Sequence, residues 1–155
     1  MPGSGDLMVD GVQYERLSRF EVDASAGPGA IRSVDQTVDS ILVTSSWLNK
    51  LGVSGDLAGL VNVRGDSMVP TIPDHSRVLI DFADRELRRD GDIFAVTLDD
   101  DFLLKRLSRF EVEGKAGYVM TSDNPSYPPR SVSAETHNYF RIVGRVRAII
   151  SEVDT

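Results

Sequence analysis

The order of apolar and polar residues along the chain predicts a mainly β protein. Short runs rich in β-branched and aromatic residues, separated by turn signals, follow one another over most of the sequence. The clearest runs are residues 60–63, 78–81, 92–98, 102–107, 118–120 and 140–150. Alternation over 19–23 indicates another strand near the N-terminus. Asp99, Asp100 and Asp101 stand between two runs and predict a hairpin turn. A calcium site there is disfavoured, because adjacent carboxylates lack the spacing of calcium-loop ligands.

One stretch, residues 45–52, has the signals of a short helix instead. A serine N-cap opens it and Gly52 closes it. Trp47 falls inside this helix, and we expect its indole in the core rather than in a ligand site.

Composition narrows the possible functions. The 155 residues suit one domain with a real core, and the absence of cysteine fits a reducing cytoplasm. We expect no membrane segment and no signal peptide, since no apolar run is long enough to span a bilayer. The chain carries 17 basic and 24 acidic residues, so direct binding to nucleic acid is not expected. Arg85, Arg88 and Arg89 are read as a solvated loop or short helix.

The first candidate for chemistry is Ser67, in the stretch Val63-Arg64-Gly65-Asp66-Ser67-Met68-Val69-Pro70. A β-prone run leads to Gly65, which permits a sharp turn, and Pro70 sets the next bend. A serine at the mouth of a strand is a possible acyl-transfer nucleophile, although most such turns only cap local structure. Asp66 is expected to stabilise the turn, with its side chain accepting hydrogen bonds from nearby amides.

The second candidate is Lys105. If residues 101–107 form a strand, Lys105 shares a face with Leu103 and Leu107, while Arg106 points to the other face. The lysine then either extends to solvent or loses solvent among its apolar neighbours. In the second case its pKa falls, and a neutral amine can accept the proton of a serine.

A third candidate is the run of small residues from Ala24 to Ala30. Composition favours a flexible linker. The functional alternative is a scissile loop, because small side chains let an extended backbone enter a narrow cleft and Gly27 leaves the carbonyl of Ala26 open to attack. His75 and His137 are the only histidines and lie far apart in sequence, so neither a metal site nor a Ser-His-Asp site is predicted.

Several motifs occur together in a recognisable order. They are Ser25–Ala30, Trp47-Leu48, Gly65–Ile72, Val78–Asp81, Gly91–Phe94, Leu104–Leu107, Ser122–Pro125, Tyr127-Pro128 and Ile142–Val146. Through them the chain from about residue 20 onward resembles the LexA-like self-cleaving repressors, and most closely the phage-repressor branch. His75-Ser76 departs from the Gly-Asp pair common in that pattern, which puts the turn geometry there in question.

This resemblance implies a LexA-like peptidase fold of strongly bent antiparallel sheets with a short helix. It implies a serine peptidase that uses a Ser67–Lys105 dyad, with backbone N–H groups of Asp66 and Ser67 holding the oxyanion. The implied scissile bond is Ala26-Gly27, with Val22 and Ala24 in apolar subsites upstream. No cofactor and no metal are implied.

The same resemblance implies a domain plan and partners. Residues 1–15 are read as a cloning remnant or linker, 16–34 as the cleavage-site region, and 35–155 as the peptidase and dimerisation domain. The implied protein is a cytoplasmic transcriptional repressor, homodimeric through this domain, whose self-cleavage a RecA nucleoprotein filament triggers in the SOS response. DNA would be bound only by a helix-turn-helix domain absent from this chain. The alternative is a non-cleaving oligomerisation or sensor module controlled by an antirepressor protein.

The resemblance does not explain one feature of the sequence. Arg16–Val22 recurs identically as Arg106–Val112, and Ala26-Gly27 is echoed by Ala116-Gly117. A single recurrence does not make a repeat architecture. We expect Ala116-Gly117 to form a hairpin tip, or to act as a decoy for the cleavage dipeptide.

Overall fold

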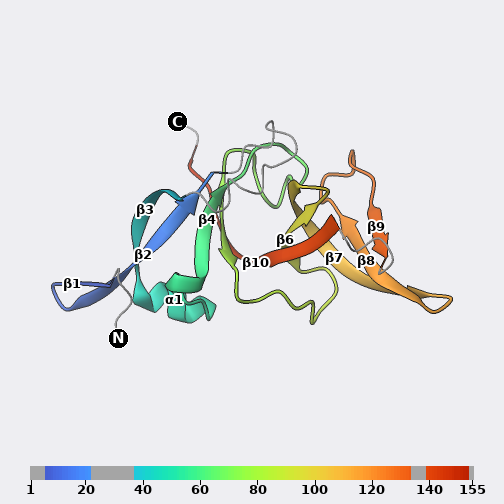
Figure 1. The fold of residues 1–155 in the computed structure, drawn as a ribbon. Coiled ribbons are helices and arrows are strands. Elements are labelled where there is room, and N and C mark those ends of the chain that lie inside the picture. The colour runs from blue at the N-terminus through green and yellow to red at the C-terminus, as the bar shows by residue number, and fades with distance from the viewer. Residues whose placement is uncertain (1–5, 22–36, 134–138, 154–155) are drawn as a thin grey trace.

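A computed structural model describes residues 6–21, 37–133 and 139–153, and it confirms the mainly β fold (Figure 1). Within these residues ten strands form one bent, open sheet, and a single α-helix accompanies it. The strands are β1 (Leu7–Val9), β2 (Val12–Phe20), β3 (Thr37–Thr44), β4 (Ala58–Asn62), β5 (Arg77–Asp81), β6 (Ile93–Leu98), β7 (Asp101–Val112), β8 (Lys115–Thr121), β9 (Arg130–Ser133) and β10 (Phe140–Ile150). The helix α1 spans Ser45–Leu51, and a 3-10 turn, η3, spans Gly55–Leu57. Neither is long and apolar enough to cross a membrane, in the part of the chain described.

The last strand of the chain lies in the middle of the sheet. The strand order is β1-β2-β4-β5-β10-β6-β7-β8-β9, with β3 also paired to β2, and among the strands of the described residues only the β2–β4 pair is parallel. β10 therefore joins an N-terminal half, β1 to β5, to a C-terminal half, β6 to β9 (Figure 1). Its register shifts between Ile142 and Gly144 and again between Val146 and Ala148. A side chain at Gly144 would meet the carbonyl oxygen of Asp81 at 2.4 Å, so this close approach requires glycine.

Three apolar clusters make up the core of the described residues. One, beneath the turn after β4, contains Val61, Met68, Ile72, Val78, Ile80, Ala95 and Leu104. A second, in the C-terminal half, contains Leu87, Phe94, Val96, Leu98, Leu107, Met120 and Val132. The third packs α1 on the N-terminal half through Leu17, Leu48, Val53, Ala58, Leu60 and Leu79.

The predicted helix is present, with one change at its start. The N-cap is Thr44, whose hydroxyl accepts from the amide of Trp47 at 3.3 Å, and not a serine. Gly52 ends the helix with a φ of 68°, as expected for a left-handed C-cap. Trp47 packs partly buried against the third cluster, which confirms its place in the core.

The hairpin turn predicted from the three aspartates is confirmed, although Asp101 is already the first residue of β7. Asp99 and Asp100 take φ values of 50° and 70° between the paired residues Leu98 and Asp101. At another turn His75 has a φ of 66°, so it adopts the left-handed conformation that a glycine would reach without strain. His75 therefore forms this turn with a backbone conformation that favours glycine.

The described part of the recurring segment up to Phe20 is a strand in β2, as its second occurrence is in β7, while the expectation that Ala116-Gly117 forms a hairpin tip was wrong. Leu17 in β2 and Leu107 in β7 are both fully buried. The tip of the β7–β8 hairpin is Glu113-Gly114, and Ala116-Gly117 lies inside β8, paired with β7. A Cβ at Gly117 would meet the carbonyl oxygen of Val132 at 2.1 Å, so close strand packing explains this glycine.

The N-terminal strand also differs from its prediction. Alternation indicated a strand over 19–23, whereas β2 begins at Val12 and ends at Phe20. Its outer part pairs with β1 (Figure 1). Leu7, Met8 and Val12 of these two strands are exposed.

Candidate active site

Ser67 lies in a turn whose following residues are anchored in the core. The chain leaves β4 and the amide of Val63 bonds to the carbonyl of Ser76 at 2.8 Å, which extends the β4–β5 pairing. Gly65 then takes a φ of 101°, and its amide donates to the carboxylate of Asp74 at 2.8 Å. Met68, directly after the serine, is buried in the first cluster. Ser67 is thus a half-buried residue on a turn held from both ends.

Lys105 occupies the position that strand alternation predicted. It lies in β7 opposite Phe94 of β6, and its neighbours Leu103 and Leu107 belong to the second apolar cluster. Leu104 faces the first cluster instead. The shared face of Lys105, Leu103 and Leu107 is therefore confirmed.

The lysine amine sits in an environment that disfavours its charge. Burial lowers the pKa of Lys105, and the nearby guanidinium of Arg130 lowers it further. The amine donates a hydrogen bond to the hydroxyl of Ser122 and lies 5.5 Å from the centre of the Tyr127 ring. Of the two alternatives for this side chain, loss of solvent is the one that the structure supports.

A single segment, residues 122–127, contacts both the serine turn and the lysine strand. We refer to Ser122–Tyr127 as the clamp segment. Besides the bond from Lys105 to Ser122, the amide of Asn124 donates to the carbonyl of Ser67 at 3.0 Å. The side-chain amide of Asn124 donates to the carbonyl of Asp66, also at 3.0 Å. Tyr127 donates its hydroxyl proton to the Asp66 carboxylate at 2.5 Å. The two candidate residues, 38 positions apart in sequence, therefore meet the same six-residue segment.

The clamp segment is itself fixed by an ion pair. Arg106 contacts both carboxylate oxygens of Asp123, at 2.6 and 3.0 Å, and also donates to the carbonyl of Gly91 at 2.7 Å. The hydroxyl of Thr71 donates to the same carboxylate. The guanidinium of Arg106 holds the pKa of Asp123 below its ordinary value. The motif around residue 123 was recognised only as part of the family pattern, and its anchoring role was missed.

The backbone around the serine leaves donors available. In the described part of the chain, the hydrogen bonds of Asp66 and Ser67 use their carbonyls and the Asp66 carboxylate, and neither backbone N–H donates. Asp66 was expected to accept hydrogen bonds from nearby amides, and this was wrong. Its carboxylate accepts from the hydroxyl of the distant Tyr127, while the carboxylate of Asp74 accepts from the turn amide of Gly65.

The proposed cleavage residues Val22, Ala24, Ala26 and Gly27 lie outside the described residues. The last described residue before them is Glu21, whose carboxylate lies 3.4 Å from the guanidinium of Arg64. Arg64 is three positions before Ser67. The chain therefore enters that segment beside the serine turn.

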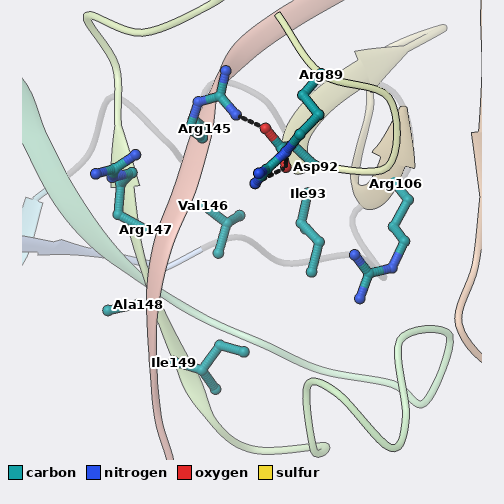
Figure 2. A pocket seen from close by; sticks show the side chains of 9 residues that line it. All are labelled: Arg89, Asp92, Ile93, Arg106, Arg145, Val146, Arg147, Ala148 and Ile149. Carbon is teal, nitrogen blue, oxygen red and sulfur yellow. Dashed lines mark hydrogen bonds and ion pairs between the residues drawn. The ribbon is translucent and has the colours of Figure 1, made fainter. Parts of the chain in front are cut away.

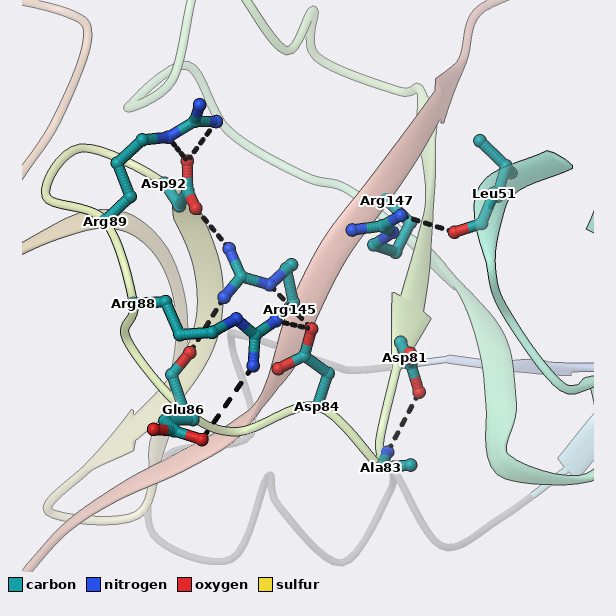
Figure 3. Close-up of polar contacts among 10 residues, drawn as sticks. All are labelled: Leu51, Asp81, Ala83, Asp84, Glu86, Arg88, Arg89, Asp92, Arg145 and Arg147. Atoms are coloured by element: carbon teal, nitrogen blue, oxygen red, sulfur yellow. Dashed lines mark hydrogen bonds and ion pairs between the residues drawn. The ribbon is translucent and has the colours of Figure 1, made fainter.

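Sequence reasoning also missed a buried arginine in the centre of the sheet. Arg145 in β10 is 6% exposed, and it donates to the carboxylates of Asp84 at 2.8 Å and of Asp92 (Figure 3). Arg88 and Arg89 pair with the same two carboxylates, at 2.8 and 3.2 Å. These arginines were expected in a solvated loop or short helix. They do lie in a loop, but the loop is tied to β10.

Beside this network lies a cavity of about 480 Å³ that contains neither Ser67 nor Lys105 (Figure 2). Ile93, Val146, Ala148 and Ile149 form its apolar part, and Arg89, Arg106 and Arg147 border it. Two of these arginines already pair with carboxylates, so the cavity is not a strongly basic site.

The described residues thus form a bent, mainly antiparallel sheet, and the clamp segment contacts both the turn of Ser67 and the partly buried Lys105. The chain belongs to the Peptidase S24-like family, whose model matches residues 19–147. It is similar to an HTH-type transcriptional regulator of Haemophilus influenzae that is described as uncharacterized, with 29% identity over 130 residues, which are 83% of this chain and 53% of the relative. It is also similar to the repressor protein CI of Enterobacteria phage phi80, with 26% identity over 109 residues, 69% of this chain and 44% of the relative. The chain thus spans about half the length of these curated relatives.

Proposed function

We propose that this chain is the self-cleaving regulatory module of a transcriptional repressor, and that it cuts its own Ala26-Gly27 bond. The observation that carries the proposal is the clamp segment, which contacts both Lys105 and the turn of Ser67. Membership of a peptidase family and similarity to two transcriptional regulators support the same conclusion.

In the proposed reaction Ser67 Oγ attacks the carbonyl carbon of Ala26 and its proton passes to the neutral amine of Lys105. The backbone N–H groups of Asp66 and Ser67 stabilise the negative oxygen. The C–N bond then breaks, and the Lys105 ammonium returns the proton to the nitrogen of Gly27. A water molecule, deprotonated by the same amine, attacks the ester carbonyl. The C–O bond then breaks, the Lys105 ammonium returns the proton to Ser67 Oγ, and the Ala26 carboxylic acid leaves and loses its proton to solvent.

The amine can serve both hydroxyls. A neutral amine has two N–H donors and one lone pair, so donation of one N–H to Ser122 leaves the lone pair available for the proton of Ser67. Lowering of the Lys105 pKa by burial increases the neutral fraction that can act as a base at a given pH.

The chain length allows the substrate to reach the serine. Glu21 is held near Arg64, and Ala26 is five residues further on. Five extended residues span about 17 Å at most, which is enough to bring the Ala26 carbonyl to the neighbouring turn. Because nucleophile and substrate share one chain, docking of the segment replaces a bimolecular encounter. We propose that a RecA nucleoprotein filament promotes this docking in the full-length, homodimeric repressor.

The test is incubation of the purified chain from pH 7 to pH 10, with mass spectrometry of the products. We expect fragments 1–26 and 27–155, formed faster at high pH, and none from Ser67→Ala or Lys105→Ala. Ser131→Ala and Lys50→Ala are the matched controls, because both residues are exposed and lie away from the serine turn. An intact chain at every pH, with RecA filament added, would overturn the proposal and favour a non-cleaving module under antirepressor control.

A further inference from the structure

We propose that Tyr127 is a positioning residue for the chemistry at Ser67. Its hydroxyl keeps the Asp66 carboxylate away from the N–H groups of the serine turn, and its ring lies against the Lys105 amine and favours the charged form of that amine. This inference rests on the proposed function. Tyr127 contacts both sides of the site, and no residue was assigned this role by the sequence.

The geometry places Tyr127 between the two halves of the sheet. Its backbone amide donates to the carbonyl of Asn124 at 3.1 Å, in a turn that the Asn124 side chain closes through the amide of Ser126 at 3.0 Å. From this turn its hydroxyl reaches Asp66 at 2.5 Å and its ring centre lies 5.5 Å from Lys105 Nζ. Its hydrogen bond to Asp66 raises the pKa of the Tyr127 phenol, so the phenol stays a donor as the pH rises.

The hydroxyl contact has a specific consequence for the oxyanion donors. An aspartate in a turn commonly accepts hydrogen bonds from backbone amides one or two positions further along. If the Asp66 carboxylate did so here, it would occupy the N–H groups that the oxyanion requires. The bond from Tyr127 directs the carboxylate away from them, and within the described residues those N–H groups have no acceptor.

The contact with the Tyr127 ring favours the charged form of Lys105, whereas burial favours the neutral form. The face of an aromatic ring attracts an ammonium group and so favours the charged form. The other groups that act on Lys105 are the guanidinium of Arg130 on β9 and the hydroxyl of Ser122, while β6 presents the apolar Phe94. Asp66 lies beyond the Tyr127 hydroxyl, and Asp123 is engaged by Arg106 and Thr71.

The first test compares self-cleavage rates in wild type, Tyr127→Phe, Asp66→Ala and the double variant. Tyr127→Phe frees the carboxylate to bind the turn amides, and we expect a loss of about tenfold or more, as when an oxyanion donor is lost. In the Asp66→Ala background the same change should cost nothing, because no carboxylate remains to block the amides. A merely structural role for Tyr127 would slow both backgrounds equally and would overturn the inference.

The second test separates the ring from the hydroxyl through the pH profile. Tyr127→Phe keeps a ring over Lys105, whereas Tyr127→Leu removes it. We expect the midpoint of the pH–rate curve to stay in place in Tyr127→Phe and to move to lower pH in Tyr127→Leu. Identical midpoints in the two variants would contradict the role of the ring.

A third measurement does not depend on cleavage. In a Ser67→Ala background, amide hydrogen exchange by NMR should show protection of the residue 67 amide in Tyr127→Phe but not after Asp66→Ala is added. Lysine side-chain NMR should show the Lys105 amine titrating at lower pH in Tyr127→Leu than in Tyr127→Phe. If the chain never cleaves but these signals appear, the proposed function fails, while the effect of Tyr127 on the Asp66 carboxylate and the Lys105 amine stands. If these NMR signals are absent, the inference on Tyr127 fails, whether or not the chain cleaves.

Discussion

The amine of Lys105 donates a hydrogen bond to the hydroxyl of Ser122, just beyond the end of β8. The β7–β8 register ends with the pair of Arg106 and Thr121, and Lys105 and Ser122 each lie one position beyond it. Both lie on the face of the second apolar cluster, because Leu107 and Met120 follow two positions away on each strand. Sheet pairing thus aims the lysine before any substrate is present.

Ser122→Ala should slow self-cleavage about tenfold, because the Lys105 amine loses the acceptor that orients it. The free energy of unfolding should fall by only about 1 kcal/mol, the typical contribution of one hydrogen bond. Rates followed by gel densitometry, together with urea unfolding, check both values. Ser131→Ala is the control on the exposed part of β9. A rate equal to that of wild type would show that pairing with Ser122 does not position the amine.

Lys105→Met should stabilise the fold at neutral pH. Burial lowers the pKa of Lys105 in the folded state, so the unfolded chain binds the proton more tightly. This group therefore destabilises the fold below its folded-state pKa, and the effect disappears as the pH rises through the ordinary value of 10.5. Melting temperatures at neutral pH and near pH 11 should show an advantage of Lys105→Met only at the lower pH. Lys50→Met, on the exposed side of α1, should show no such dependence.

Arg145→Met should destabilise the protein by about 3 to 5 kcal/mol. The side chain is buried, and its removal leaves Asp84 and Asp92 partly buried without their central cation. Its guanidinium also lies 4.6 Å from the ring of Phe94, a contact that methionine replaces only in part. Urea unfolding measures the loss. Arg141→Met, four positions earlier on β10 and exposed, should change stability by about 0.5 kcal/mol or less. Similar losses in both variants would contradict the account of Arg145.

Gly117→Ala should cost about 1 to 3 kcal/mol, since the new methyl group would meet the Val132 carbonyl and the Phe110 ring. Ala116→Gly, at the exposed neighbouring position, should cost about 0.5 to 1 kcal/mol through backbone entropy alone. Denaturation midpoints compare the two. A loss in Gly117→Ala no greater than that in Ala116→Gly would mean that strand packing does not explain this glycine.

Local patterns predicted the elements and the lysine face well. Alternation along 101–107 placed Lys105 with Leu103 and Leu107, and turn chemistry located Asp99-Asp100 and Gly52. These features depend on the period of a strand or the backbone preference of one residue, and both can be read from neighbouring positions.

Contacts between distant segments could not be read in the same way. Nothing near Tyr127 indicates that its hydroxyl meets Asp66, which lies 61 positions earlier. Arg145 alternates with apolar residues and resembles a surface position, yet it is buried because two carboxylates from the β5–β6 connection meet it. Such pairs depend on strand order, and the insertion of β10 between β5 and β6 leaves no local signal.

The central place of β10 has a consequence for the timing of activity. Ser67 belongs to the half of the sheet that is synthesised first and Lys105 to the half that follows, and the strand that joins them, β10, comes after both in the chain. A nascent chain can hold both residues and still lack the connection that sets them against one segment. We therefore expect nascent molecules to be protected from cutting themselves until β10 has been synthesised.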